Sequence, residues 1–327
     1  MSELYETRKK RFIVARDFYE GFCYFGRSDL RSVPGIAKDF GVADYLKGHI
    51  TVDGREMLTQ LDWDLISREE FYQKLGDKRV KITTAPPNLE EYCEIFTKYI
   101  NEGYGVLSMS ISSKISGTYD FSCVAANRVR EKHPQAEIYC FDSFRMSGAF
   151  GLLVAHAHRL KNEGKTMQEV IDWLEENKVR VHQMGPIDDL IYVARRGRIT
   201  MGKAIMGSFA GVKPMGDCNS DGYTTVLTKA KGIKKALDIT VKYVKETADG
   251  IEDQFLIISH SDRELYANTL KEMLEKELNP KKVYVSDVFA GSGANIGPGM
   301  IGVYYLGKPI SPDLSAEKEA MNRILGK

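Results

Sequence analysis

The stretch GVLSMSISSKISGT, residues 105–118, decides how the fold of this chain is read. Residues 105–111 form a short apolar run that predicts a buried strand, and helical spacing follows from Gly117 to Lys132. Serines crowd the end of this strand, where open α/β sheets bind ligands and where a helix N-terminus favours an anionic oxygen. We therefore expect a strand–helix unit with a place for an anionic group, although an ordinary N-cap at Ser116 explains the local pattern equally well.

The alternation of strand and helix continues downstream. Residues 138–141 predict a second buried strand, and helical patterns follow at 144–161 and 167–176, the latter opened by a capping box at Thr166. Strands and helices at this spacing are typical of βαβ units on a parallel sheet. We therefore expect an N-terminal α/β domain with a parallel sheet over residues 1–185.

After about residue 185 the glycines become frequent and strands follow one another around turns. A helix is predicted at 233–245, and Ser261 is expected to cap another helix that ends at Glu277. Strands are predicted at 223–227, 255–258, 283–289 and 299–306. This pattern favours a C-terminal α+β domain with a mixed or antiparallel sheet over residues 186–327.

The composition argues against several classes of protein. Lysine and arginine (46) nearly balance aspartate and glutamate (45), which argues against a nucleic-acid or membrane-surface protein. No apolar run approaches the roughly 18 residues of a membrane helix, and no apolar core follows the N-terminal charges as in a signal peptide. The five cysteines are scattered and the six histidines lack metal-binding spacing. We expect a cytoplasmic protein with reduced thiols, no stable membrane insertion, no metal and no cofactor.

Three further motifs carry weaker signals. Residues 83–88 (TTAPPN) predict a rigid turn, which either holds Thr84 toward a ligand or merely leads into a helix. The loop from Gly197 to Lys203 is similar to a phosphate-binding loop, but Ala204 stands where a hydroxyl must bind Mg²⁺. Residues 293–299 (GANIGPG) predict a glycine-rich turn before an apolar strand. The chain has no G-x-S-x-G motif of a serine hydrolase.

Several motifs occur in a fixed order along the chain. They are SSKISGTY at 112–119, DS at 142–143, LIYVARRGRI at 190–199, VKP at 212–214, DG at 221–222 and GANIGPG at 293–299. No single motif is decisive, but the ordered set resembles the DegV family of fatty-acid-binding proteins. The resemblance covers roughly residues 50–307.

The resemblance implies a two-domain α/β architecture in which a long-chain fatty acid lies between the domains. The carboxylate-binding residues that it implies are Thr84, Ser116, Gly117, Thr118 and Asn295. Arg198 matches an arginine that supports the head group or a docking surface. The resemblance further implies a non-catalytic protein that presents its ligand to the separate catalytic subunit of a fatty acid kinase.

Three features depart from the family pattern. A D-S-T motif near the first strand is missing, Ala85 replaces a serine, and Asn295 replaces a histidine. An asparagine amide donates hydrogen bonds but does not shuttle a proton. The leading hypothesis is a fatty-acid carrier without catalytic residues. The alternatives are a phosphoryl-transfer enzyme that uses the loop from Gly197 to Lys203, and a lipid-sensing regulatory module.

Overall fold

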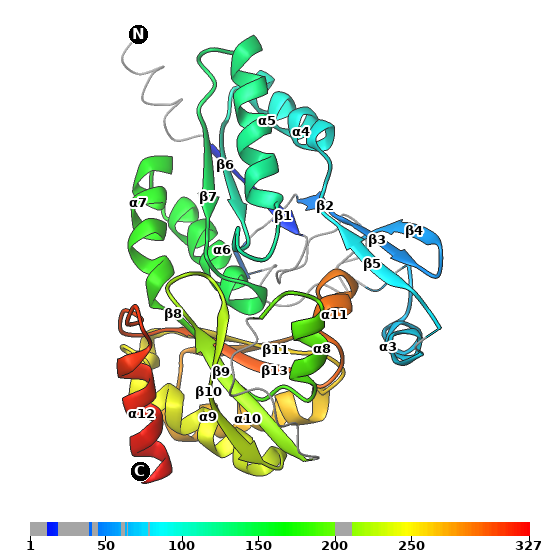
Figure 1. Cartoon of the computed structure of the whole chain (residues 1–327). Coiled ribbons are helices and arrows are strands. Elements are labelled where there is room, and N and C mark those ends of the chain that lie inside the picture. Colours follow the sequence, from blue (N-terminus) through cyan, green and yellow to red (C-terminus); the bar gives the residue numbers. More distant parts are fainter. Residues whose placement is uncertain are drawn as a thin grey trace.

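The computed structural model describes residues 12–18, 39–40, 45–59, 63, 65–77, 79–199 and 211–327. In this part of the chain the strands form four sheets: two of four strands, one of three strands and one hairpin of two. Two α/β lobes stand end to end, and the three-stranded sheet projects beside their junction (Figure 1). Most of the first fifty residues lie outside the described part.

The first lobe is built on a parallel sheet with the strand order β2-β1-β6-β7. Its strands are β1 (Phe12–Phe18), β2 (Leu46–Lys47), β6 (Gly105–Ser110) and β7 (Ile138–Asp142). Helices α4 (Leu89–Asn101) and α5 (Thr118–Lys132) pack on one face, and α6 (Ser147–Asn162) and α7 (Met167–Asn177) on the other. Val106 and Leu107 of β6 point into these two different cores. The predicted parallel sheet and its strand–helix unit are confirmed.

Helix α6 joins the two lobes. Its residues from Ser147 to His158 are all buried, because the first sheet covers one side and strands of the second lobe cover the other. A side chain at Gly148 would clash with the ring of Tyr304, 2.3 Å from an ideal Cβ. The small residues in this helix therefore allow the second sheet to approach closely.

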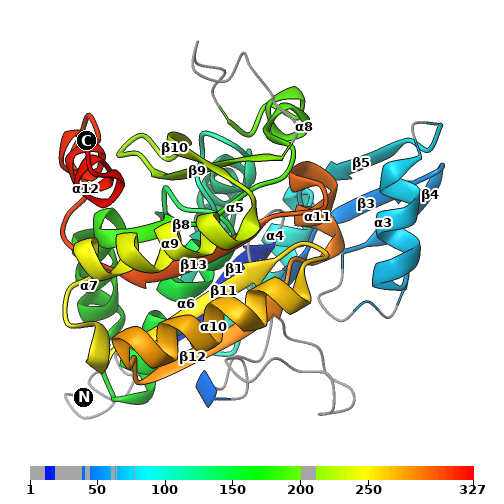
Figure 2. The same ribbon diagram turned by 90° about the horizontal axis from the view of Figure 1, so that it is seen from below.

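The second lobe carries a mixed sheet with the strand order β12-β11-β13-β8, as predicted. Its strands are β8 (Val181–Met184), β11 (Phe255–His260), β12 (Lys282–Asp287) and β13 (Ile301–Leu306). Helices α9 (Ile233–Thr247), α10 (Glu264–Leu278) and α12 (Ser315–Leu325) share a core with the sheet face that α6 leaves open (Figure 2). Strand β8 lies before residue 185, so the chain enters this sheet ahead of the expected domain limit.

Smaller elements lie at the junction between the lobes and beside it. They are the sheet of β3 (His49–Val52), β4 (Arg55–Leu58) and β5 (Ile82–Ala85), the helices α3 (Arg68–Gly76), α8 (Leu190–Arg195) and α11 (Ala290–Ile296), and the hairpin of β9 (Val212–Cys218) and β10 (Thr224–Lys231). Helix α11 contacts α3, α8, β3 and β5, and thus connects the three-stranded sheet to the rest of the molecule.

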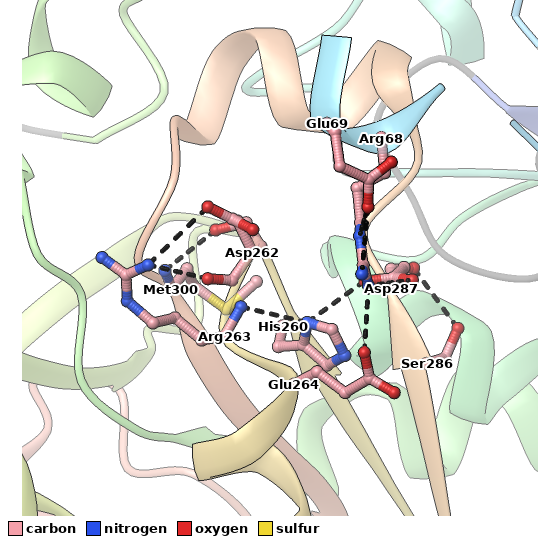
Figure 3. A network of polar contacts seen from close by, with 10 residues as sticks. Arg68, Glu69, His260, Asp262, Arg263, Glu264, Ser286, Asp287 and Met300 are labelled. Carbon is pink, nitrogen blue, oxygen red and sulfur yellow. Dashed lines mark hydrogen bonds and ion pairs between the residues drawn. The ribbon is translucent and has the colours of Figure 1, made fainter. Parts of the chain in front are cut away.

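Ion pairs fasten α3 to the second lobe (Figure 3). The Arg68 guanidinium lies 3.2 Å from carboxylate oxygens of Asp287 and Glu264. His260, buried at the end of β11, has its Nδ1 3.2 Å from the Asp287 carboxylate. These contacts hold the three-stranded sheet in place at the carboxyl ends of β11 and β12.

Four local expectations differ from the structure. Thr84 lies in strand β5 and not in a turn. Residues 290–296 form α11, so only the end of the GANIGPG motif is a turn. Helix α6 begins at Ser147 and not at 144, because Asp142 Oδ1 accepts the Phe144 N–H and holds that segment outside the helix. Ser261 Oγ accepts the N–H of Met300 at 2.9 Å in place of capping α10.

Candidate functional site

An apolar cavity lies between α8, α11, β8, β13 and the β9–β10 hairpin. The apolar residues of its wall are Ile115, Met146, Met184, Pro186, Ile187, Leu190, Val193, Ile199, Pro214, Met215, Val226, Ile296, Met300, Ile301 and Tyr304. They come from both lobes, since Ile115 and Met146 belong to the first. This composition suits a long hydrocarbon chain, because each buried methylene is favourable by about 0.8 kcal/mol.

Helix α11 contributes two polar side chains to the cavity. The amide Nδ2 of Asn295 donates to Thr84 Oγ1 at 3.2 Å and to Gly291 O at 3.1 Å. This contact brings together two predicted site residues that are 211 positions apart in the sequence. Ser292, which is 2% exposed, has a hydroxyl without a hydrogen-bond partner among the described residues. Such an unpaired buried hydroxyl is costly in a protein without a ligand.

The loop after β6 carries the other predicted residues. Ile115 of this loop lines the cavity, and the neighbouring Ser116 and Thr118 are buried. Ser116 Oγ accepts the Thr118 N–H at 3.3 Å, whereas Gly117 takes the N-cap position of α5, which no side chain of the described residues caps. The interpretation of Ser116 as an ordinary N-cap is therefore wrong. Thr118 Oγ1 is buried and has no hydrogen-bond partner among the described residues.

Arg198 also lines the cavity, half-buried beside α8. One of its guanidinium nitrogens donates to the carbonyl of Arg196 at 3.1 Å. Residues 200–204 of the glycine-rich loop that is similar to a phosphate-binding loop lie outside the described residues.

Tyr192 and Arg196, which the sequence reasoning missed, fasten α8 to its surroundings. The Tyr192 hydroxyl donates to Ala294 O of α11 at 2.6 Å, and Arg196 donates both to this hydroxyl and to Ile82 O of β5. The signal that could have revealed them is their spacing of four residues, which places both side chains on one face of a helix. They hold together the elements that carry Thr84, Arg198 and Asn295.

The chemistry of the cavity is that of binding. Hydroxyl and amide groups lie beside an apolar space, and they are suited to orient the polar end of an amphipathic molecule. Among the described residues, no group of three or more His, Cys, Asp or Glu side chains is arranged to hold a metal ion. No described helix combines the length and the apolar character needed to span a bilayer.

Comparisons with known proteins agree with the fold and the motifs. The DegV family model matches residues 34–308. A DegV domain-containing protein of Clostridium perfringens is 31% identical over 277 residues, which cover 85% of this chain and 94% of that protein. The chain belongs to the DegV family.

Solved structures of the family have the same fold. A fatty-acid-binding DegV family protein from Thermus thermophilus superimposes with a TM-score of 0.76 at 24% identity, over 91% of this chain and 99% of that chain. The Fatty Acid Kinase B3 protein of Streptococcus pneumoniae, loaded with linoleic acid, gives a TM-score of 0.72 at 15% identity, over 90% and 98%. The two-lobe α/β architecture is thus the architecture of this family.

Proposed function

We propose that this protein binds a long-chain fatty acid between its two domains, at 1–185 and 186–327, and carries it without catalysing its conversion. The observation that carries the proposal is the apolar cavity whose wall includes the buried, unpaired hydroxyl of Ser292 beside Asn295. The carboxylate-binding residues of the proposal are Thr84, Ser116, Gly117, Thr118 and Asn295. The fatty acids bound by the Thermus thermophilus and Streptococcus pneumoniae proteins support this ligand class.

The energetics of such a ligand suit this site. A saturated C16 acid has about fourteen methylenes, and their burial at about 0.8 kcal/mol each contributes on the order of 10 kcal/mol before ordering costs. The carboxylate then needs orientation by neutral donors and a helix N-terminus, and not a full ion pair. Asn295 acts in this arrangement by holding Thr84 in place through their hydrogen bond.

The ligand itself is tested by extraction. Denaturing mass spectrometry of the purified protein is expected to find a C14–C18 fatty acid in near-stoichiometric amount, and delipidated protein is expected to take up labelled palmitate. Protein that contains no lipid and does not bind palmitate would overturn the proposal.

A second part of the proposal concerns a partner. The protein presents the bound carboxylate to a separate fatty acid kinase subunit, as the name of the Streptococcus pneumoniae protein suggests for that relative. Arg198 lines the cavity, and in this proposal its positive charge supports the head group where the acyl phosphate would form. Arg195, three residues before it, is exposed.

The partner is tested by reconstitution. The protein with ATP alone is expected to form no acyl phosphate, whereas addition of a kinase subunit produces it. Arg198→Ala is expected to reduce this phosphorylation more than it reduces lipid binding, and Arg195→Ala is the matched control. ATP-dependent turnover by the protein alone would contradict the non-enzymatic assignment and favour phosphoryl transfer.

A further inference from the structure

A pair of polar side chains interrupts the apolar wall of the cavity away from α11. Gln183 of β8 and Thr224 at the start of β10 both line the cavity, and Gln183 Nε2 donates to Thr224 Oγ1 at 2.7 Å. Gln183 is 9% exposed, so its amide is almost wholly removed from solvent. In both views α11 lies beside the three-stranded sheet, whereas β8 lies apart from that sheet (Figures 1 and 2).

Neither member of this pair uses its full hydrogen-bonding capacity. The bond to Thr224 uses one of the two N–H groups of the Gln183 amide, and the carbonyl Oε1 takes no part in it. Within the described residues the Thr224 hydroxyl donates to the sulfur of Met146 at 3.5 Å, and a thioether is a weak acceptor. A carbonyl acceptor and a weakly used hydroxyl donor therefore lie beside the same apolar space.

The amide is not needed to hold β8 in place. The backbone N–H of Gln183 donates to Asp217 Oδ1 at 2.8 Å, and the strand pairs with β13 in regular register, where Gln183 lies opposite Tyr304. A leucine or methionine at this position would line the cavity without the cost of burying an amide. The side chain is thus better explained by what enters the cavity than by the fold.

We propose that the preferred ligand is a fatty acid with a hydroxyl group along its chain, and that Gln183 and Thr224 bind this hydroxyl. This inference rests on the proposed function. A hydroxyl donates to Gln183 Oε1 and accepts from the Thr224 hydroxyl, and so satisfies both groups at once, whereas a ketone would leave Oε1 unpaired. The carboxylate is bound elsewhere, by residues of β5, α11 and the loop after β6.

The experiment compares stearic acid with a series of positional hydroxystearic acids by equilibrium binding to delipidated protein. At least one isomer is expected to bind about tenfold more tightly than stearic acid, because a site built for a hydroxyl group discriminates against a ligand without one. In Gln183→Leu this preference is expected to disappear while stearic acid binds at least as well as before. Thr224→Val is expected to reduce the preference in the same direction.

Two controls keep the result interpretable. Gln168→Leu makes the same chemical change on the exposed face of α7, outside the cavity, and is expected to preserve the preference. Gln183→Met serves as a second variant should the leucine variant fail to fold. If stearic acid binds but no hydroxy isomer exceeds it, or if the preference persists in Gln183→Leu, this inference is overturned and the proposed function stands. If no fatty acid binds, both are overturned.

Discussion

Two buried polar regions of the molecule differ in how completely their groups are paired. The Asp217 cluster consists of Asp217, His182, Tyr243, Thr247 and Tyr305. Asp217 accepts four hydrogen bonds, from His182 Nδ1 at 2.6 Å, the Tyr243 hydroxyl at 3.0 Å and the backbone N–H groups of Gln183 and Cys218. The polar groups of the cavity, by contrast, include the buried Ser292 hydroxyl, which has no hydrogen-bond partner among the described residues.

The difference separates structure from binding. A buried group whose partners are all supplied by the protein rigidifies the fold, because removal of any member leaves the others unpaired. A buried group without a partner weakens the fold, and its presence is explained when a ligand supplies the missing bond. Substitutions in the Asp217 cluster should therefore affect stability, and substitutions in the cavity should affect ligand affinity.

The largest expected effect is in the Asp217 cluster. Asp217→Ala should lower the free energy of unfolding by about 3–5 kcal/mol, because it leaves His182 and Tyr243 without their buried partner. Urea denaturation measures the change, and Asp221→Ala, on an exposed turn, is the control and should stay within about 0.5 kcal/mol. A loss no larger than the control's would remove the contrast between the two regions.

Substitution of Ser116 should lower ligand affinity and leave the stability of the fold unchanged. Hydrogen bonds to a charged group contribute about 1.5–3 kcal/mol, so Ser116→Ala should weaken fatty-acid binding roughly ten- to a hundredfold while the fold stays intact. Binding of a fluorescent fatty acid and the urea midpoint measure the two quantities. Ser113→Ala in the same loop is the matched control. Unchanged affinity would place the carboxylate elsewhere.

Two buried histidines sharpen the comparison through their pH dependence. Burial between Trp173 and Phe255 lowers the pKa of His156 to about 3. Burial alone would also lower the pKa of His182, but its contact with Asp217 outweighs this effect and raises it. The stability linked to His182 is therefore present below its unfolded pKa and is lost as the pH rises through the folded pKa.

The stability contribution linked to His156 depends on pH in the opposite direction. Its contribution is present above the unfolded pKa of about 6.5 and is lost as the pH falls toward the folded pKa, because only the unfolded chain takes up a proton. Between pH 7 and pH 5 this costs about 2 kcal/mol, and His156→Phe should remove that part of the acid loss. Urea unfolding at the two pH values measures it. Equal acid sensitivity in wild type and variant would show that His156 is protonated in the folded protein.

The smallest effect is expected at Thr84. Thr84→Val should reduce fatty-acid affinity about two- to tenfold, less than Ser116→Ala, because a single neutral hydroxyl is lost while Asn295 keeps its bond to Gly291 O. Thr84→Ser, which retains the hydroxyl, should bind nearly as wild type. A larger loss in Thr84→Val than in Ser116→Ala would reverse the proposed order of importance.

The elements around residues 105–132 and 166–177 were predictable because local chemistry specifies them. The short apolar run of β6 is buried on both faces, which is typical of a strand in a parallel sheet. The capping box of Thr166 and Glu169 opens α7 as predicted. The ordered motifs likewise identified the family, since each depends on a short run of residues. Thr84, Arg198 and Asn295 were singled out in this way before their surroundings were known.

The sequence did not predict contacts between distant segments. The bond between Asn295 and Thr84 depends on how α11 packs against β5. Strand β8 belongs to the second sheet because it pairs with β13, which lies far away in the sequence. Gln183 was missed because a glutamine in a short strand carries no local signal of facing a cavity. Spacing and caps therefore determined the helices, the strands and the family, whereas only tertiary packing decided which polar groups are paired, because a partner's position depends on the whole chain.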